Sequence, residues 1–446
     1  MQTLLNPYFI FLLVIFLSVF IYVVKHEEYI PGFIFFVFAS LGAVLQISNL
    51  GQVGLLKAVL LLFLAAVLIS KKMKKVERLP LFGMSILFVY LLTIYISGTI
   101  NNIPLSDYRA ELGLIVMAMV IALSPNRADT FKAIMIGVFL WGLINAIVVV
   151  LAKLGFRWGG LVLFNEGGRA IGLSRHSTFM GAYFSIALVA AQILFIQARL
   201  KLVKVILFGC GLLIMLGLLA TIARGAFIGW LAAFLYIQYR IQGMKVGSVV
   251  GIFAAAIIGI AAASMLGLDQ LLLDRFTGME KDSSAQARLP LLLASLETVA
   301  NHLFLGAGIG WKDTSMNLQS HNMFMQVLVE SGVVGFIIFM FILWKAGWSL
   351  LRRSNSTIVV NSNTESPVDS QQNKIDTNNQ PVYSGVTLRK PVVKLSKETV
   401  DTGVRQYYVG LVAMLGAILL NSLTHSFDFF LPIWVLIGVG FMREEV

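Results

Sequence analysis

The chain has 446 residues, is 58% hydrophobic and only 13% charged, and has a mean hydropathy of +0.86. Soluble globular domains are about 45–50% apolar and about 25% charged, so this composition excludes a soluble enzyme. The net charge is +12. In a membrane protein such an excess of cations sets the orientation of the loops, and we therefore expect no nucleic-acid partner. The single cysteine, Cys210, excludes an intrachain disulfide and a cysteine-based metal site.

Apolar runs of spanning length predict an all-α polytopic membrane bundle of 12–13 transmembrane helices. Each crossing takes about 20 residues, and in lipid such runs must be helical because their backbone groups need internal partners. About 190 residues then remain for loops, where function is expected. A very short link between the second and third runs leaves the number of crossings open. The runs fall at about 8–24, 31–48, 51–70, 80–99, 110–123, 131–152, 177–197, 202–222, 225–239, 246–266, 322–344, 406–424 and 428–442.

The Lys/Arg distribution predicts which side each loop faces. The segment KKMKKVER (71–78) is strongly basic and is placed in the cytoplasm. Alternation then puts loops 100–109, 153–176 and 267–321 outside, and thirteen crossings put the N-terminus outside as well. The expected organisation is N-terminal transmembrane helices (1–152), catalytic core helices with outer loops 153–176 and 267–321 (153–344), a disordered, Asn/Ser/Thr/Gln-rich cytoplasmic loop (345–405) and C-terminal transmembrane helices (406–446).

The cations predicted to face outward are mostly arginines. Sorting by side gives 23 cations inside, 10 outside and Lys57 within a crossing. Arginine presents a planar fork that matches phosphate and carboxylate oxygens, although headgroup contacts and ordinary loop ion pairs also use it. The outer set is Lys153, Lys281, Lys312, Arg109, Arg157, Arg169, Arg175, Arg224, Arg275 and Arg288.

Arg224 lies in TIARGAFIGW, at the join of two apolar runs with almost no loop between them. A charge at such a depth is costly and usually faces a polar cavity. The alternative is an arginine that snorkels to the membrane interface. Gly225 beside it is expected to let the chain turn tightly.

Four of the five histidines, all except His26, fall at outer positions. His321 opens the run SHNMFMQVLVESGVVGF directly after the long outer loop, and His425 with Asp428 forms a second candidate pair. Histidine exchanges a proton near neutral pH, but a lone interfacial histidine also serves structural roles.

The long outer loop contains an amphipathic segment and a glycine-rich turn. Residues 288–303 have helical apolar spacing and are expected to lie along the membrane face. The GAGIG stretch (306–310) lacks the Lys-Ser/Thr of a phosphate loop, so we expect a tight turn between helices. The sequence has no HExxH, no CxxC and no Asp-rich cluster, and neither a metal nor another cofactor is expected.

Three stretches, in this order and with this spacing, resemble the O-antigen ligase superfamily, which also holds O-antigen polymerases and O-linked oligosaccharyltransferases. GRAIGLSRHSTFMGAYFSIAL is similar to the family's arginine-containing outer loop and glycine-bearing helix. TIARGAFIGW is similar to its Thr-x-Ser-Arg-Gly motif, with Ala223 in place of the serine. ARLPLLLASLETVANHLFLGAGIGW, followed by the His-Asn segment, is similar to its amphipathic helix and glycine turn, although Leu289 and Pro290 follow Arg288 where many members carry a tryptophan nearby.

The resemblance implies a metal-independent, inverting glycosyltransferase of the bacterial inner membrane, with its active site facing the periplasm. It would transfer a glycan from an undecaprenyl-diphosphate donor to a lipid A-core or glycan acceptor, with membrane lipid around it. The arginines would stabilise the diphosphate leaving group, and His321 would act as the general base. The implied catalytic residues are His321, Arg288 and Arg224, the diphosphate-binding residues are Arg175, Arg169, Arg224 and Arg288, and the reserve candidates are His425, Asp428 and Glu166.

Other functions remain open at this point. The complete arginine set and the His-Asn segment favour an O-antigen ligase, and the alternative within the superfamily is an O-antigen or exopolysaccharide polymerase. A transporter or flippase for a lipid-linked sugar would show inverted repeats or ionisable residues near mid-membrane. A scaffolding membrane protein would have little use for arginines and histidines gathered on one side.

Overall fold

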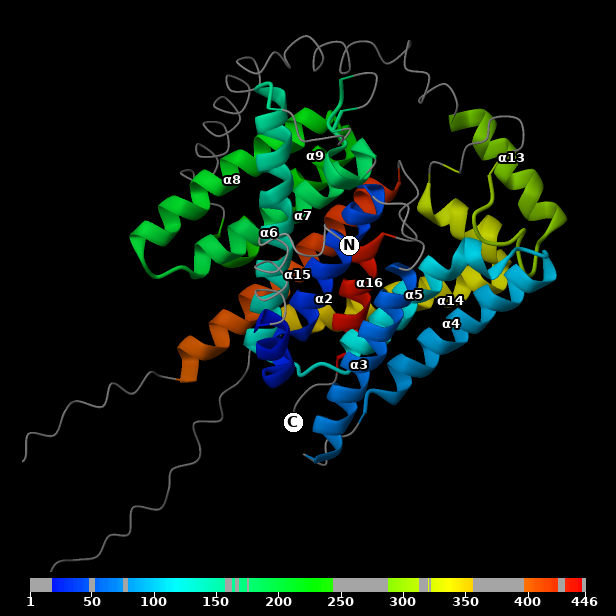
Figure 1. Ribbon diagram of the computed structural model, residues 1–446, viewed down its shortest axis with the longest axis horizontal. Helices are drawn as coiled ribbons and strands as arrows, with labels where there is room; N and C mark the ends of the chain where they lie inside the picture. The colour runs from blue at the N-terminus through cyan, green and yellow to red at the C-terminus, as the bar shows by residue number, and fades with distance from the viewer. Residues whose placement is uncertain are drawn as a thin grey trace, which may run out of the picture.

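The computed structural model describes residues 18–47, 53–74, 79–156, 163–164, 168–174, 176–243, 288–312, 320, 322–355, 397–423 and 430–442. These residues form helices joined by short turns (Figure 1). In chain order the elements are η2 (Glu27–Tyr29), α2 (Ile30–Ile47), α3 (Val53–Lys74), α4 (Leu81–Ile100), α5 (Leu105–Ala122), α6 (Ala128–Lys153), η3 (Gly172–Ser174), α7 (Ser177–Gln197), α8 (Lys201–Thr221), α9 (Arg224–Ile237), η4 (Gln238–Gln242), α13 (Arg288–Asn301), α14 (Met323–Asn355), α15 (Lys397–Ser422) and α16 (Leu431–Gly440).

The predicted fold class, an all-α polytopic membrane bundle, is confirmed. Six helices of the described part are long and apolar enough to cross a bilayer, namely α4, α6, α7, α8, α14 and the 403–422 part of α15. The described residues contain no β-strand, only an isolated bridge between Phe164 and Ala170. The count of 12–13 crossings stays a prediction, because the run at 246–266 lies outside the described residues.

The connections between the long helices gather at two ends of the bundle, and these ends differ chemically. The end that carries residues 101–103, 168–174, 222–224 and 302–312 is called the loop end. The opposite end is called the cation end, and Arg240, Arg353 and Arg405 lie there. Contacts across each end support this sorting: Arg169 bonds to Thr221 at the loop end, and Gln197 bonds to Gly403 at the cation end. The residues gathered at the loop end were all predicted to face outward, and the topology and its orientation in the membrane stay predictions.

Small residues let the central helices approach closely, as is usual between helices in lipid. A Cβ added to Gly32 of α2 would lie 2.2 Å from the carbonyl oxygen of Ala133 in α6. A Cβ added to Gly229 of α9 would lie 2.6 Å from that of Ala417 in α15. Helix α7 lies in the middle of this packing, with 72% of its most apolar window buried. The loop end therefore rests on a tightly packed framework.

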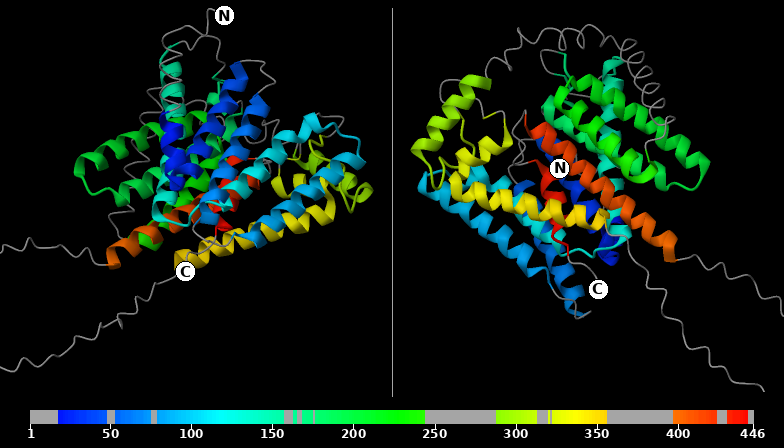
Figure 2. Two further views of the ribbon diagram at one scale, coloured as in Figure 1. Left: turned by 60° about the horizontal axis from the view of Figure 1, so that its bottom comes forward. Right: turned by 180° about the vertical axis from the view of Figure 1, so that it is seen from behind.

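Helices α4 and α14 run obliquely to α6 and α7 (Figures 1 and 2). Helix α14 is kinked at Gly332, where φ is 63° and ψ is −171°, so a short segment at 323–331 precedes the long one. The long segment continues to Asn355, and α15 begins at Lys397. Helices therefore occupy both ends of the segment 345–405 that was predicted to be a disordered loop. Residues 356–396 of that segment lie outside the described residues.

Candidate active site at the loop end

The corner between α8 and α9 is made by a strained residue. Ile222 has φ 54° and ψ 32°, a left-handed conformation that is rare for a β-branched side chain. The amide of Ala223 donates to Thr221 Oγ1 at 3.3 Å, which stabilises the corner. The expectation that Gly225 makes the turn is wrong, because Gly225 already lies within α9. Its neighbour Arg224 is placed by the turn at Ile222.

Arg224 is the first residue of α9 and is partly buried. The N-terminus of a helix carries partial positive charge, so a cation there is unfavourable for the helix dipole. The cap residue, Ala223, makes no side-chain capping hydrogen bond. A cation combined with the N-terminal amides of a helix is a suitable arrangement for binding an anion.

A loop between α6 and α7 brings Arg169 to the same corner. The amide of Ala170 donates to the carbonyl of Ala220 at 2.8 Å, and Arg169 Nε donates to the carbonyl of Thr221 at 3.1 Å. Buried Asn145 of α6 accepts from the amide of Leu173 at 3.0 Å and so holds the loop from below. Arg169, Thr221, Ile222 and Arg224 are called the arginine corner from here on.

Helix α7 passes directly beneath the arginine corner. A Cβ added to Gly181 would lie 2.7 Å from Ala223 Cβ and 3.1 Å from Thr221 Oγ1, so only glycine permits this approach. His176 caps the start of this helix, and its Nδ1 accepts from the amide of Thr178 at 3.3 Å. The first of the family-like stretches therefore packs against the second in space.

The GAGIG stretch forms the predicted tight turn and also completes the kink of α14. Gly306, Gly308 and Gly310 all have positive φ. The kink at Gly332 interrupts the helical hydrogen bonds, and the turn replaces them. The amides of Ala307 and Gly308 donate to the carbonyls of Val329 and Glu330 at 2.7 and 3.1 Å, and the amides of Val333 and Val334 donate to those of Leu303 and Phe304 at 2.8 and 3.3 Å. The turn and the kink are packed too closely for a side chain at position 332, because a Cβ on Gly332 would lie 2.3 Å from the carbonyl oxygen of Phe304.

A buried polar pair fastens this turn to the start of α14. Glu330 is 2% exposed, and its Oε1 accepts from Gln326 Nε2 at 2.6 Å and from the amide of Gly310 at 2.9 Å. Gln326 Nε2 also donates to the carbonyl of Trp311 at 3.1 Å, and its Oε1 accepts from the amide of Ser320 at 2.8 Å. Gln326 and Glu330 are called the polar brace. The brace fixes both ends of the segment 312–320.

Helix α4 completes the brace from the other side. Ser97 Oγ donates to the carbonyl of Glu330 at 2.9 Å, and Asn101 Nδ2 donates to the carbonyl of Gly306 at 3.1 Å. These contacts bridge more than 200 positions of sequence and tie the turn to the N-terminal helices.

Asn322 caps α14 and connects it to α15. Its Oδ1 accepts from the amides of Phe324 and Met325 at 2.9 and 3.2 Å, and its Nδ2 donates to the carbonyl of Leu423 at 3.4 Å. Both described neighbours of position 321, Ser320 and Asn322, are thus held by hydrogen bonds. Five candidates predicted from the sequence lie outside the described residues: His321, Arg175, Glu166, His425 and Asp428.

The structure brings Arg169 and Arg224 together but does not bring Arg288 to them. Arg288 is exposed and is the first residue of α13, which is helical as predicted and packs on α14. Figure 1 shows α13 on one flank of the bundle, beside α14, and α8 on the other, and the reverse view in Figure 2 agrees. Like Arg224, Arg288 is placed at the N-terminus of a helix.

Four residues of this site were not predicted from the sequence: Gln326, Glu330, Ser97 and Asn101. Gln326 and Glu330 could have been predicted as site residues, because they lie four positions apart in an otherwise apolar run, shortly before Gly332. Ionisable residues inside spanning segments are rare and usually functional. Ser97 and Asn101 carried no such signal. Their role depends on a long-range contact that only the fold reveals.

The fold and the loop end define a multi-pass helical membrane protein with arginines at helix N-termini and a buried polar brace at one end. Residues 208–340 match the family model described as O-antigen ligase. The match spans Thr221, Ile222 and Arg224 of the arginine corner, α13, the glycine turn and the kink, but not Arg169, and it confirms the resemblance to the O-antigen ligase superfamily over this segment. It indicates an enzyme of the membrane glycosyltransferase type. A search of curated proteins finds no match to the chain.

Proposed function

We propose that the protein transfers a glycan from an undecaprenyl-diphosphate carrier to an acceptor at the loop end, and that it is an O-antigen ligase acting on lipid A-core. The loop end would face the periplasm, and the membrane would be the bacterial inner membrane. The observation that carries the proposal is the arginine corner, where Arg224 begins α9 inside the matched segment and Arg169, which precedes that segment, bonds to the residue before the turn.

The arginine corner suits the leaving group of this reaction. Breaking the bond between the sugar and the diphosphate develops negative charge on the leaving oxygens, and preorganised donors stabilise that charge. Arg224 adds a guanidinium to the partial positive charge of the α9 N-terminus. The bond from Arg169 Nε to Thr221 fixes the plane of a second guanidinium. Arg288, at the start of α13, and Arg175 are proposed as further diphosphate ligands.

His321 is proposed as the general base that takes the proton of the acceptor hydroxyl. The bond that forms joins the acceptor oxygen to the anomeric carbon, and the bond that breaks releases the diphosphate carrier with its electron pair. A single direct displacement inverts the anomeric centre. Support comes from the residues on either side of position 321, since Ser320 is held by the polar brace and Asn322 caps α14. His425, Asp428 and Glu166 are kept as reserve candidates.

Deleting the gene and restoring it as variants tests the proposal in cells. We expect the deletion to remove all polymer-capped lipopolysaccharide on a gel while lipid-linked donor accumulates on the outer leaflet. His321→Ala and Arg288→Ala should fail to restore it at normal expression. Normal capping by His321→Ala would remove His321 from the mechanism, and unchanged donor use by Arg288→Ala would refute its diphosphate role.

The same gel separates the competing functions. A single-repeat form of lipopolysaccharide in the deletion strain would identify a polymerase and overturn the ligase. Donor accumulation on the cytoplasmic leaflet would identify a flippase.

A further inference from the structure

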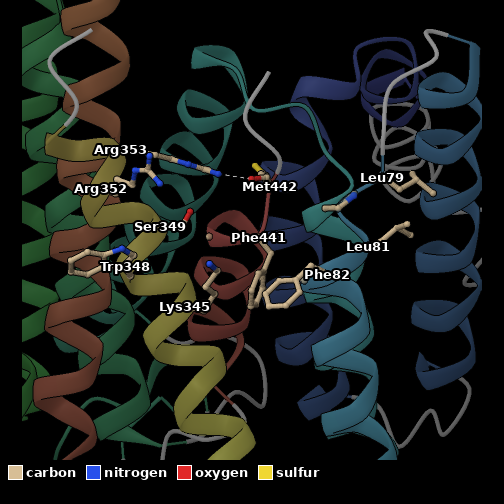
Figure 3. A pocket seen from close by; sticks show the side chains of 13 residues that line it. Leu79, Leu81, Phe82, Lys345, Trp348, Ser349, Arg352, Arg353, Phe441 and Met442 are labelled. Atoms are coloured by element: carbon tan, nitrogen blue, oxygen red, sulfur yellow. Dashed lines mark hydrogen bonds between the residues drawn. The ribbon is translucent and has the colours of Figure 1, made fainter. Parts of the chain in front are cut away.

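A cavity of about 420 Å³ opens at the cation end, and the loop-end residues do not line it. Figure 3 shows the side chains around it. Its walls are the first turn of α4, the last three turns of α14 and the end of α16. We propose that this cavity binds the phosphate headgroup of an anionic phospholipid. The proposal is independent of glycan transfer, because none of the loop-end residues takes part in it.

One face of α14 supplies the charge. Lys345, Ser349 and Arg352 are spaced at i, i+4 and i+7, which places them on one stripe of the helix, and all three line the cavity. Two cations with a hydroxyl between them offer a phosphate group several charge-assisted hydrogen bonds. The described lining residues include no Asp or Glu. The first turn of α4 forms the facing wall and adds the partial positive charge of a helix N-terminus to this field.

Arg353 has a structural role at the cavity, because its guanidinium contacts α15 and the end of α16. Its Nη2 donates to the carbonyl of Met442 at the end of α16, as the dashed line in Figure 3 shows. Its guanidinium also lies over the Tyr408 ring of α15, 5.7 Å from the centroid. These contacts fix α14, α15 and α16 to one another and keep the walls apart at a set distance.

The apolar rim indicates a lipid and not a soluble phosphate. Leu81, Phe82 and Trp348 line the cavity and are 64%, 58% and 56% exposed. Lys345 Nζ lies 5.6 Å from the centroid of the Phe82 ring, so charge and apolar surface adjoin directly. Tryptophan is enriched where headgroups meet acyl chains. A free phosphate would use only the cations, whereas a phospholipid would also cover the rim.

The position of the cavity fits this ligand. The cation end is the side predicted to face the cytoplasm, whose leaflet attracts basic segments through its anionic lipids. Basic pockets between transmembrane helices on that side are known headgroup sites. A volume of about 420 Å³ is within the range of about 300–1,000 Å³ usual for small-ligand sites.

Native mass spectrometry of the full-length protein in mild detergent, titrated with phosphatidylglycerol, tests the proposal. The double variant Lys345→Gln/Arg352→Gln is expected to bind the lipid at least about tenfold more weakly than the wild type. The matched control is Lys201→Gln/Lys204→Gln, which removes the same charge from the same end. Lys204 also lies over an aromatic ring, that of Phe195, but outside the cavity. The control should bind like the wild type.

Three outcomes would overturn the proposal. They are equal binding by both double variants, equal binding of zwitterionic phosphatidylethanolamine, and displacement of the lipid by millimolar inorganic phosphate. A second measurement needs no variant. A photoactivatable phosphatidylglycerol should crosslink to wild-type peptides containing Phe82 or Trp348, and labelling elsewhere on the protein without labelling there would refute the site.

Discussion

Both ends of the bundle carry arginines, but the arginines that lie inside the first or last turn of a helix occupy opposite helix ends. At the cation end, Arg352 and Arg353 lie in the last turn of α14, and Arg240 in that of η4. Cations there complement the helix dipole and bond to terminal carbonyls, as Arg240 does to Ser354. At the loop end, Arg224 and Arg288 begin their helices, where the dipole opposes them.

This difference separates a stabilising role from a functional one. At the cation end, Arg240, Arg352 and Arg353 follow the rules for stable helix ends, although Lys201 begins α8 and Arg127 precedes α6 there. The cations of this end also satisfy the topological bias of membrane proteins. The loop end departs from those rules at three places: the cations at helix N-termini, the left-handed Ile222 and the glycine-only conformation of Gly332. Such departures persist where the surrounding structure enforces them, and they cluster at functional sites. Four substitutions, each with a matched control, test this comparison.

Gly332→Ala should have the largest effect on stability. Both the φ/ψ values and the 2.3 Å approach to the Phe304 carbonyl exclude a side chain, so we expect a loss of about 3 kcal/mol or more. Thermal unfolding in detergent measures it. Gly347→Ala, in the same helix toward the cation end, is the control, because its nearest neighbour is 3.5 Å away. Equal melting of the two variants would show that the kink is not required.

Glu330→Ala should cause the second-largest loss of stability. It removes the acceptor of Gln326 Nε2 and of the Gly310 amide inside the bundle, which costs about 2–4 kcal/mol. Glu330→Gln keeps one acceptor oxygen and should recover most of the stability. If both variants melt like the wild type, the polar brace does not hold the turn.

Gly181→Ala should displace the arginine corner at a cost of about 1–3 kcal/mol, since the new methyl group meets Ala223 Cβ at 2.7 Å. Transfer activity should fall along with stability. Gly209→Ala on α8, which has no neighbour within 4 Å, is the control. Full activity of Gly181→Ala would separate the corner from catalysis.

Asn101→Ala should have the smallest effect, about 1 kcal/mol, because it removes the hydrogen bonds to the carbonyls of Ser97 and Gly306. Thr99→Ala, whose exposed hydroxyl bonds only within its own helix in the described contacts, should change the melting temperature less. Reversal of that order would contradict the link between α4 and the turn.

Apolar runs of spanning length were sufficient to predict the long helices, because length and apolarity decide these in a membrane. The glycines of GAGIG were sufficient to predict the turn at 306–310. The sequence was not sufficient for the corner, where a buried contact network forces Ile222 and not Gly225 into the turn. The apolar run 322–344 was predicted from the sequence to be one uninterrupted helix, whereas the structure has a kink at Gly332. The kink depends on hydrogen bonds from a turn more than twenty residues earlier.

The central claim is that the loop end, and not the cation end, performs glycan transfer. Helix α9 allows a direct test, because Arg224 begins it and Arg240 lies just beyond its end. The measurement is transfer of a labelled glycan from its undecaprenyl-diphosphate carrier by purified, reconstituted protein. We expect Arg224→Ala to lose about 100-fold or more in rate, while Arg240→Ala stays within a few-fold of the wild type. Equal rates for the two variants, or a greater loss in Arg240→Ala, would contradict the central claim.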